Sequence, residues 1–159
     1  MLVEDRLKEA NLVLPTAQPS VANYLPGIEE GGLLFISGQL PMRSGKVAYQ
    51  GKVGHDVDID AAKKAAELCA LNILGQAKAI LGDLDRINRC IRLGGFVNCG
   101  EEFRDHASVL NGASDLLVIA LGNAGRHARV AVGCSSLPLG AAVEVEAVFS
   151  IKSRPVEAS

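Results

Sequence analysis

The sequence predicts an α+β fold, in which one mixed β-sheet carries two helices on one of its faces. Two observations lead to this prediction. Apolar residues recur at helical spacing over residues 59–81 and 105–121, and they alternate with more polar residues over 142–152. Strands and helices that alternate along a chain suit a single sheet covered on one side. The predicted order is one or two strands, a helix, a strand, a second helix and two final strands.

The first third of the chain gives shorter signals. Residues 1–12 have apolar residues at helical spacing and predict a short amphipathic helix that ends before Pro15. The apolar run over 33–39 predicts a strand that stops at Pro41. Residues 42–56 contain three glycines and scattered charges, which indicate a hairpin or a loop.

The clearest helix covers residues 59–81. Its apolar stripe is formed by Ala62, Ala66, Cys69, Ile73, Ala77 and Ile80. Asp58 or Asp60 can cap its start, and Gly82 stands where a C-terminal cap is expected. The second helix is predicted to begin after Asp105 and to end at Gly122, with a stripe of Val109, Ala113, Leu116, Leu117 and Ala120.

Three strands are predicted in the second half, over 87–98, 129–134 and 142–152. Gly94 and Gly95 suggest a bulge in the first of them. The Pro/Gly turn before 142 predicts that the last two strands are adjacent and antiparallel. One face of the last strand carries Glu144 and Glu146 beside apolar residues, and a half-apolar exposed face favours oligomerisation.

Length and composition narrow the class of protein. The 159 residues predict one domain, and 48% hydrophobic residues exclude intrinsic disorder. A net charge of −2 leaves no basic excess for a nucleic-acid partner. The four cysteines lack CxxC or Cys/His spacing, so we expect free thiols of a cytoplasmic protein and no metal site. No apolar run approaches the roughly 20 residues of a membrane span, and the N-terminus does not resemble a signal peptide.

Arg129 is the first candidate for chemistry, because it enters a strand of small apolar residues and needs a partner there. A structural salt bridge to Glu144 or Glu146 is the more common arrangement. A ligand carboxylate is the alternative, since the guanidinium binds carboxylates through two parallel hydrogen bonds. If the two final strands are adjacent, Arg129 and Glu144 can face one pocket, with the acid handling protons. His127 shares the strand face of Arg129 if the strand extends back that far.

Several segments of the chain resemble the Rid (YjgF-like) family of reactive imine/enamine deaminases, over about residues 20–152. The resemblance rests on Tyr24 ahead of Gly27, the run from Phe35 to Pro41, Asn111, and the interval from Arg129 to Glu144. The segments 111–114 and 125–129 resemble the longer YjgF/chorismate-mutase-like subgroup, which carries the label "endoribonuclease L-PSP". Residues 1–18 would then be an N-terminal extension of the single domain, 1–159.

The resemblance implies a chorismate-mutase-like fold, a homotrimer and sites between subunits, with no cofactor. Arg129 would bind the substrate carboxylate, helped by the backbone amide of Ala131, and Glu144 would position the attacking water. Tyr24, Ser37, Gly38 and Asn111 would shape the pocket, with Tyr24 reaching across from the neighbouring subunit. One position departs from the deaminase pattern, because Ala131 stands where a cysteine is common.

The implied reaction converts 2-imino acids, formed from enamines of the 2-aminoacrylate type, into 2-keto acids and ammonia. Arg129 would fix the carboxylate while Glu144 holds water against the imine carbon. A second hypothesis is a non-catalytic trimer that binds a small carboxylate metabolite. The net charge and the lack of a histidine pair argue against RNA cleavage. Chorismate mutase activity would need several cations, of which only Arg129 is evident.

Overall fold

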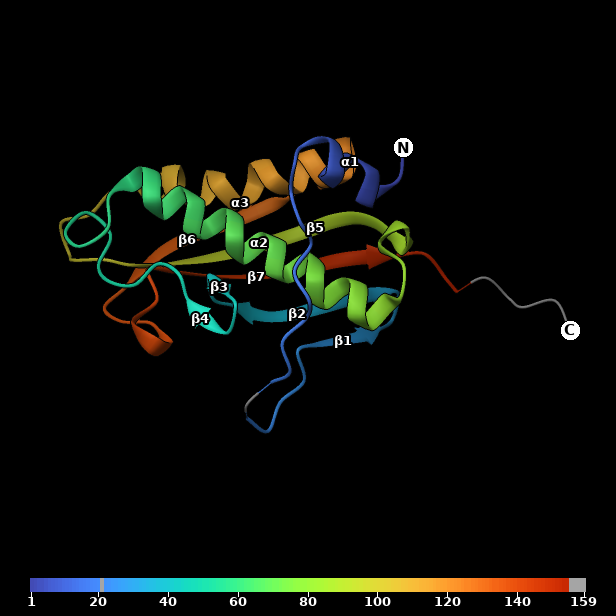
Figure 1. The fold of residues 1–159 in the computed structure, drawn as a ribbon, viewed down its shortest axis with the longest axis horizontal. Coiled ribbons are helices and arrows are strands. Elements are labelled where there is room, and N and C mark those ends of the chain that lie inside the picture. The colour runs from blue at the N-terminus through green and yellow to red at the C-terminus, as the bar shows by residue number, and fades with distance from the viewer. Residues whose placement is uncertain (21, 155–159) are drawn as a thin grey trace, which may run out of the picture.

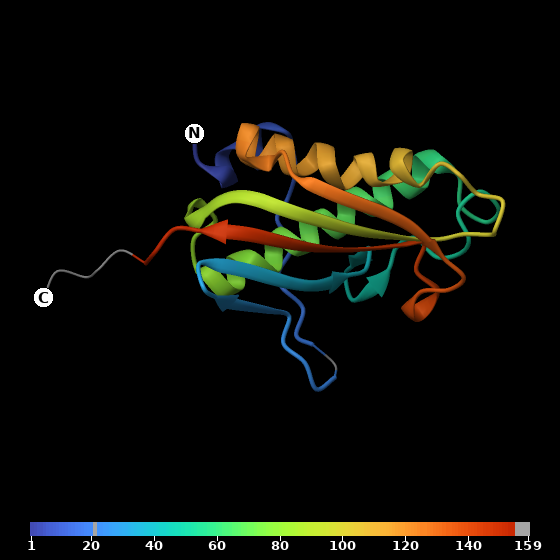
Figure 2. The same ribbon diagram turned by 180° about the vertical axis from the view of Figure 1, so that it is seen from behind.

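The computed structural model describes residues 1–20 and 22–154 and contains a five-stranded sheet with two long helices on one face (Figures 1 and 2). The helices are α1 (Val3–Glu9), α2 (Ile59–Leu81) and α3 (His106–Leu121). The sheet strands are β1 (Gly27–Glu30), β2 (Leu33–Gln39), β5 (Ile87–Asn98), β6 (Ala128–Cys134) and β7 (Val143–Ile151), and β3 (Met42–Arg43) and β4 (Lys46–Val47) form a separate hairpin. The predicted α+β class, with two helices on one face of a mixed sheet, is confirmed.

The strands lie in the order β1-β2-β7-β5-β6, and every neighbouring pair is antiparallel except β5 and β6. The prediction that β6 and β7 are adjacent is therefore wrong, because β5 separates them. Helix α3 connects β5 to β6 as a crossover, which makes those two strands parallel. The turn Pro138–Gly140 reverses the chain, but it leads past β5 to the central position of β7.

Gly94 and Gly95 do not form the predicted bulge. Both pair regularly with β6 and β7, and the irregular register of β5 lies at its start, between Ile87 and Arg92. The two glycines instead leave room for side chains on the two faces of the sheet. A Cβ on Gly94 would collide with Glu146, and a Cβ on Gly95 would collide with Leu110 of α3.

Helix α2 follows its predicted stripe closely. Five of the six stripe residues are buried and Ile80 is partly buried. Asp58 caps the helix by accepting a 2.7 Å hydrogen bond from the Ala61 amide, and Gly82 ends it at a φ of 79°. Asp105 precedes α3 but its side chain makes no capping hydrogen bond.

Helices α2 and α3 touch through their backbones at Gly112. A Cβ at this position would collide with the carbonyl group of Lys63 in α2. A glycine is therefore required where α3 passes Lys63, and this contact allows the close spacing of the two helices. Asn111 directly precedes this contact, so the contact also positions a residue of the candidate site.

In the N-terminal third, the first helix is shorter than predicted, whereas β2 covers the predicted residues 33–39. Helix α1 ends at Glu9, and its buried residues Val3 and Leu7 pack against the same core as α3. The region 42–56 contains the β3–β4 hairpin and a following turn. Strand β1 pairs with β2 from Gly27 to Glu30 and forms one edge of the sheet.

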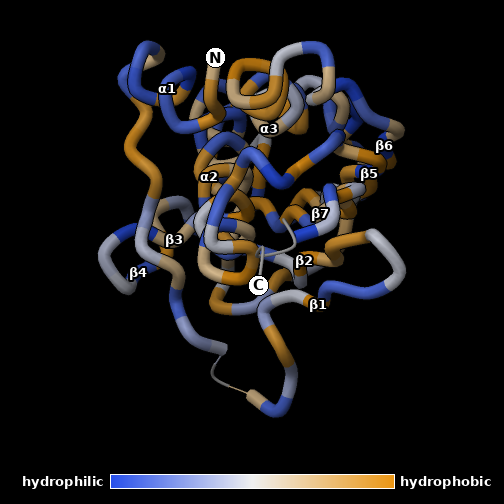
Figure 3. The backbone as a smooth tube through the Cα atoms, turned by 90° about the vertical axis from the view of Figure 1, so that its right-hand side faces the viewer, coloured by the Kyte–Doolittle hydropathy of each residue, from blue (hydrophilic) through white to orange (hydrophobic). Residues whose placement is uncertain are grey.

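The two faces of the sheet differ in character. Figure 3 shows hydrophobic residues concentrated along the strands and the two long helices. On the face without helices, several apolar side chains are at least partly exposed: Ile28, Phe35, Val130 and Val132. Glu144 and Glu146 belong to this open face, as the alternation in β7 predicted.

One segment, His106–Gly125, is long and apolar enough to meet the length and composition criterion for a membrane span. The sequence-based expectation that no segment approaches this criterion therefore needs correction. In this structure, however, α3 is a covering helix of the sheet, with Val109, Leu110 and Ala113 buried in the common core.

Candidate functional site

Arg129 extends from β6 toward α3 on the helix-covered face of the sheet. Its Nη1 donates to Asn111 Oδ1 at 2.9 Å and to Ser114 Oγ at 3.1 Å, and its Nη2 donates to the Ala107 carbonyl at 3.4 Å. All three acceptors are neutral. Within residues 1–20 and 22–154, Arg129 forms no salt bridge, so the predicted alternative of an ion pair with Glu144 or Glu146 is wrong.

His127 and Ser114 extend this hydrogen-bond network. Ser114 Oγ lies 2.9 Å from His127 Nε2, and His127 Nδ1 lies 2.6 Å from the Gly125 carbonyl. A carbonyl can only accept, so Nδ1 donates to the Gly125 carbonyl, and Nε2 is left to pair with the Ser114 hydroxyl. Ser114 was not among the residues predicted for the site. The available signal was its position three residues after Asn111, which places both on one face of a helix.

Glu144 lies on the opposite, open face of the sheet. Its half-buried carboxyl group sits against Gly38 of β2, where an added Cβ would collide with it. Burial raises the pKa of Glu144, and the nearby Glu146 carboxylate raises it further. A raised pKa keeps a carboxyl group closer to the range in which it can exchange protons near neutrality.

Tyr24 and Gly38 line a cavity of about 300 Å³ between residues 18–20 and 24–26 on one side and the end of β2 on the other. Tyr24 is exposed, and Gln39, Gln76 and Leu139 also line this space. Ser37 donates its hydroxyl hydrogen to the Leu25 carbonyl at 2.7 Å. The Ser37 side chain thus binds the protein's own backbone within this chain.

The predicted site residues fall into two groups within one chain. Arg129, Asn111 and Ala131 lie where β6 meets α3, and Ala131 occupies the same strand face as Arg129. Tyr24, Ser37, Gly38 and Glu144 lie around β2 and β7. Strand β5 separates the groups, and Arg129 and Glu144 project from opposite faces of the sheet. The predicted single pocket with both residues is therefore not formed within one chain.

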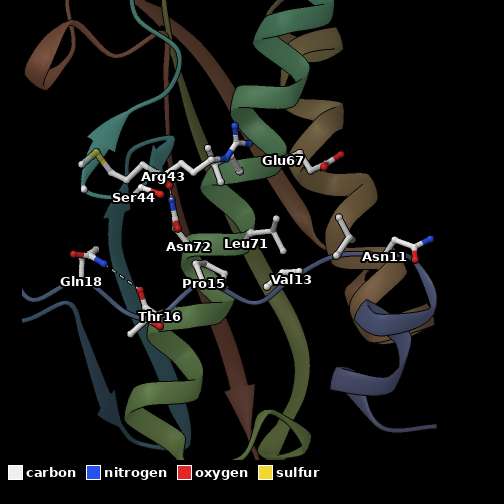
Figure 4. A pocket seen from close by; sticks show the side chains of 14 residues that line it. Asn11, Val13, Pro15, Thr16, Gln18, Arg43, Ser44, Glu67, Leu71 and Asn72 are labelled. Carbon is white, nitrogen blue, oxygen red and sulfur yellow. Dashed lines mark hydrogen bonds between the residues drawn. The ribbon is translucent and has the colours of Figure 1, made fainter.

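A further cavity lies elsewhere, on the outer side of α2. It has a volume of about 600 Å³ and is bounded by the segment 11–18, the β3–β4 hairpin and α2 (Figure 4). Leu68 and Leu71 contribute an apolar floor, and Arg43 and Glu67 contribute charge at the rim. It contains none of the predicted site residues. Among the described residues no group of three His, Cys, Asp or Glu side chains is arranged to hold a metal ion.

Comparison with known proteins connects these features to a family. The model of the family described as "YjgF/chorismate mutase-like, putative endoribonuclease" matches residues 4–150. The chain belongs to this family. Protein TCP17 of Trypanosoma cruzi is 40% identical over 152 residues, which cover 95% of each chain.

Solved structures agree with this membership. The protein Atu1372 of Agrobacterium tumefaciens is 54% identical, with a TM-score of 0.89 over 94% of this chain and 92% of its own. An endoribonuclease-like protein of Shewanella oneidensis is 36% identical, with a TM-score of 0.92 over 95% and 100%. Escherichia coli TdcF, solved with bound serine, is 19% identical with a TM-score of 0.62 over 89% and 98%, and it shares the fold.

Proposed function

We propose that this protein hydrolyses reactive 2-imino and enamine acids of the 2-aminoacrylate type to 2-keto acids and ammonia. The observation that carries the proposal is the guanidinium of Arg129, which is held in place by three neutral acceptors. Because these acceptors orient the guanidinium without neutralising its charge, Arg129 can still bind an anion. The planar guanidinium matches the geometry of a carboxylate. The serine bound to TdcF is a small carboxylate in a protein of the same fold.

In the proposed mechanism, Arg129 orients the substrate through its carboxylate. Glu144 holds a water molecule and accepts a proton as the oxygen attacks the imine carbon. Glu144 passes this proton to the imine nitrogen, which gives a neutral carbinolamine. The carbinolamine hydroxyl proton then moves to the nitrogen through Glu144 as the C–N bond breaks, so that ammonia leaves and a 2-keto acid remains. Imines already hydrolyse in water, so positioning and one acid–base group supply the required acceleration, and the proposed reaction needs no cofactor.

The separation of the two groups of residues supports a site shared between subunits. Strands β1 and β6 are the two edges of the sheet, and the open face carries exposed apolar side chains. A homotrimer that brings the β6–α3 group of one copy to the β2–β7 group of the next would place Arg129 near the neighbouring Glu144. We propose this arrangement for the 159-residue chain as a single domain in the cytoplasm, with Tyr24, Ser37, Gly38, Asn111 and Ala131 around the substrate.

A coupled assay tests the activity. A PLP-dependent dehydratase generates the imino acid, and pyruvate release is followed with wild-type protein, with Arg129→Ala and with Arg126→Ala as a matched exposed control. We expect acceleration by the wild type and the control, and none by Arg129→Ala. If wild type and Arg129→Ala give the same rate, the deaminase proposal is wrong for this substrate.

Mixing two inactive variants tests the shared site. Arg129→Ala and Glu144→Gln are each purified, then unfolded and refolded together, and light scattering checks that trimers form. If each site takes Arg129 from one subunit and Glu144 from the next, roughly a quarter of the sites contain both native residues after random mixing. Recovery of activity supports the shared site, whereas no recovery in mixed trimers contradicts it.

A non-catalytic carboxylate binder is the second candidate. It is favoured by Ala131, which stands at the position where the deaminase branch commonly has a cysteine. This candidate predicts that small 2-keto or amino acids bind to the wild type but not to Arg129→Ala, as measured by calorimetry, while neither protein accelerates pyruvate release.

A further inference from the structure

A separate small cavity lies at the carboxyl ends of β5 and β6, beyond the Arg129 network. Its volume is about 350 Å³, and it is bordered by the loop between β5 and α3 and by the last residues of β6. Cys99 and His106 both line it, together with Phe103, Arg104 and Gly133. None of these residues has a role in the proposed deamination.

Cys99 and His106 form a thiol–imidazole pair in this cavity. Cys99 Sγ lies 3.6 Å from His106 Nε2, within hydrogen-bonding distance for sulfur. Gly133 makes the approach possible, because a Cβ there would lie 2.7 Å from Nε2 and 2.8 Å from Sγ. A thiol that can pass its proton to an imidazole is a stronger nucleophile than an isolated thiol.

The surrounding structure holds both partners in place. The Cys99 amide donates to the Cys134 carbonyl at 3.1 Å, which ties the residue to the end of β6. The His106 ring packs edge-on against Phe103, with ring centroids 5.2 Å apart. The side chain of Arg104 donates to the carbonyls of Glu101 and Phe103 and braces the connecting loop.

The other three cysteines provide an internal contrast. Burial raises the pKa of Cys69 and Cys134, and it raises the pKa of Cys90 to about 12. The other two histidines contact oxygen atoms, since His55 lies beside Asp56 and His127 beside Ser114. In the described chain, only Cys99 is hydrogen-bonded to an imidazole.

We propose that Cys99, with His106 as its base, is a reactive thiol and a modification site for small electrophiles such as peroxides. With hydrogen peroxide, the thiol proton passes to His106 Nε2 while sulfur attacks one peroxide oxygen. The S–O bond forms as the O–O bond breaks, and His106 returns the proton to the departing hydroxide. The products are a sulfenic acid and water, so sulfur is oxidised and peroxide is reduced.

Neither Cys99 nor His106 takes part in the proposed deamination, but His106 begins the helix that also carries Asn111 and Ser114. Ala107, which directly follows His106, accepts a hydrogen bond from Arg129 Nη2. An oxygen added to Cys99 Sγ would occupy the space beside His106, which is the first residue of α3, and would press on the start of this helix. Modification of this thiol is therefore positioned to influence how Arg129 is held.

Peptide-resolved alkylation tests the inference without any enzyme assay. Folded protein is treated briefly with iodoacetamide near pH 7, and mass spectrometry gives the labelling rate of each cysteine. We expect Cys99 to react faster than the more exposed Cys134 by about tenfold or more. His106→Gln should reduce the Cys99 rate by a similar factor and leave Cys134 unchanged, whereas the control His55→Gln should change neither.

Treatment with hydrogen peroxide followed by dimedone should label the same residue. Equal or faster labelling of Cys134 in folded wild-type protein overturns the inference, and this comparison does not depend on the folding of any variant. An unchanged Cys99 rate in folded His106→Gln also overturns it. Circular dichroism of each variant establishes that it is folded.

Discussion

Arg86 and Arg129 are both arginines next to the sheet, but their surroundings differ. Arg86, before β5, is 8% exposed, and its Nη2 donates to Glu29 Oε1 at 2.8 Å and to the Lys152 carbonyl. Arg129, in β6, is half-buried and bound only by neutral oxygens in the described chain. The first arginine has a carboxylate partner, the exposed Glu29 of the edge strand β1, whereas the second has no carboxylate partner among the described residues.

This contrast separates a structural arginine from a candidate binding arginine. A buried cation without a carboxylate is unfavourable, so the Glu29 pair is needed for Arg86 to stay where it is. The Arg129 guanidinium is oriented by Asn111 and Ser114 yet keeps its charge free. We therefore expect changes around Arg86 to alter stability and changes around Arg129 to alter ligand binding and activity.

The largest expected effect is that of Arg129→Lys. A single ammonium group cannot reproduce the two parallel hydrogen bonds of a guanidinium to a carboxylate. We expect kcat/KM in the coupled assay to fall by about 10²-fold or more, with little change in the thermal unfolding midpoint. Kinetics like those of the wild type would contradict the carboxylate-binding role of Arg129.

Glu29→Gln should lower stability and leave activity unchanged, the reverse of Arg129→Lys. Removing the carboxylate leaves Arg86 buried with neutral partners, and we expect a loss of about 1–3 kcal/mol in unfolding free energy with activity retained. Arg86 holds the pKa of Glu29 below its ordinary value of 4.5. The stabilisation is therefore present above about pH 4.5 and is lost as the pH falls through the lower folded-state pKa. Chemical denaturation at pH 7 and pH 3 should show the variant and wild type converging in acid.

Gly38→Ala probes the other half of the candidate site. The new methyl group must displace the flexible end of the Glu144 side chain. We expect activity to fall by about tenfold, because a misplaced acid–base group loses part of its catalytic contribution. Thermal unfolding should change little, and a wild-type rate in a folded variant would argue against the proposed role of Glu144.

Glu144→Gln should produce the smallest change in stability, with a sign opposite to that of Glu29→Gln. Burial and Glu146 raise the folded-state pKa of Glu144 above 4.5, so ionisation costs the native state stability as the pH rises through that range. The variant should be more stable than wild type at pH 7 by less than about 1 kcal/mol and equally stable at pH 3. Urea denaturation at the two pH values measures this difference.

The spacing of apolar residues predicted most helices and strands well, because it shows which face of each helix or strand is buried. The spacing of the α2 stripe and the alternation in β7 both reappear as buried residues. Strand pairing was predicted less well, since the turn at Pro138 shows only that the chain reverses. The strand–helix–strand order from β5 to β6 already indicated a parallel pair.

The sequence predicted which residues belong to the candidate site, but it did not predict where they lie relative to one another. Arg129 and Glu144 were identified, yet their opposite faces follow from the pairing of both strands with β5, which the sequence alone does not reveal. The contact between Gly38 and Glu144 depends on the register of β2 against β7. The pairing of Cys99 with His106 was not predicted, because it depends on how the loop between the two residues folds back.

The glycine contact between α2 and α3 also bears on how this protein can change during evolution. At Gly112 the two helix backbones touch, so α3 cannot move closer to α2, and any larger residue must push the helices apart. Asn111, Ser114 and His106 all belong to α3, so a shift of this helix displaces the three residues together. A substitution at Gly112 would thus change the geometry of both the arginine network and the cysteine–histidine pair, although Gly112 contacts neither.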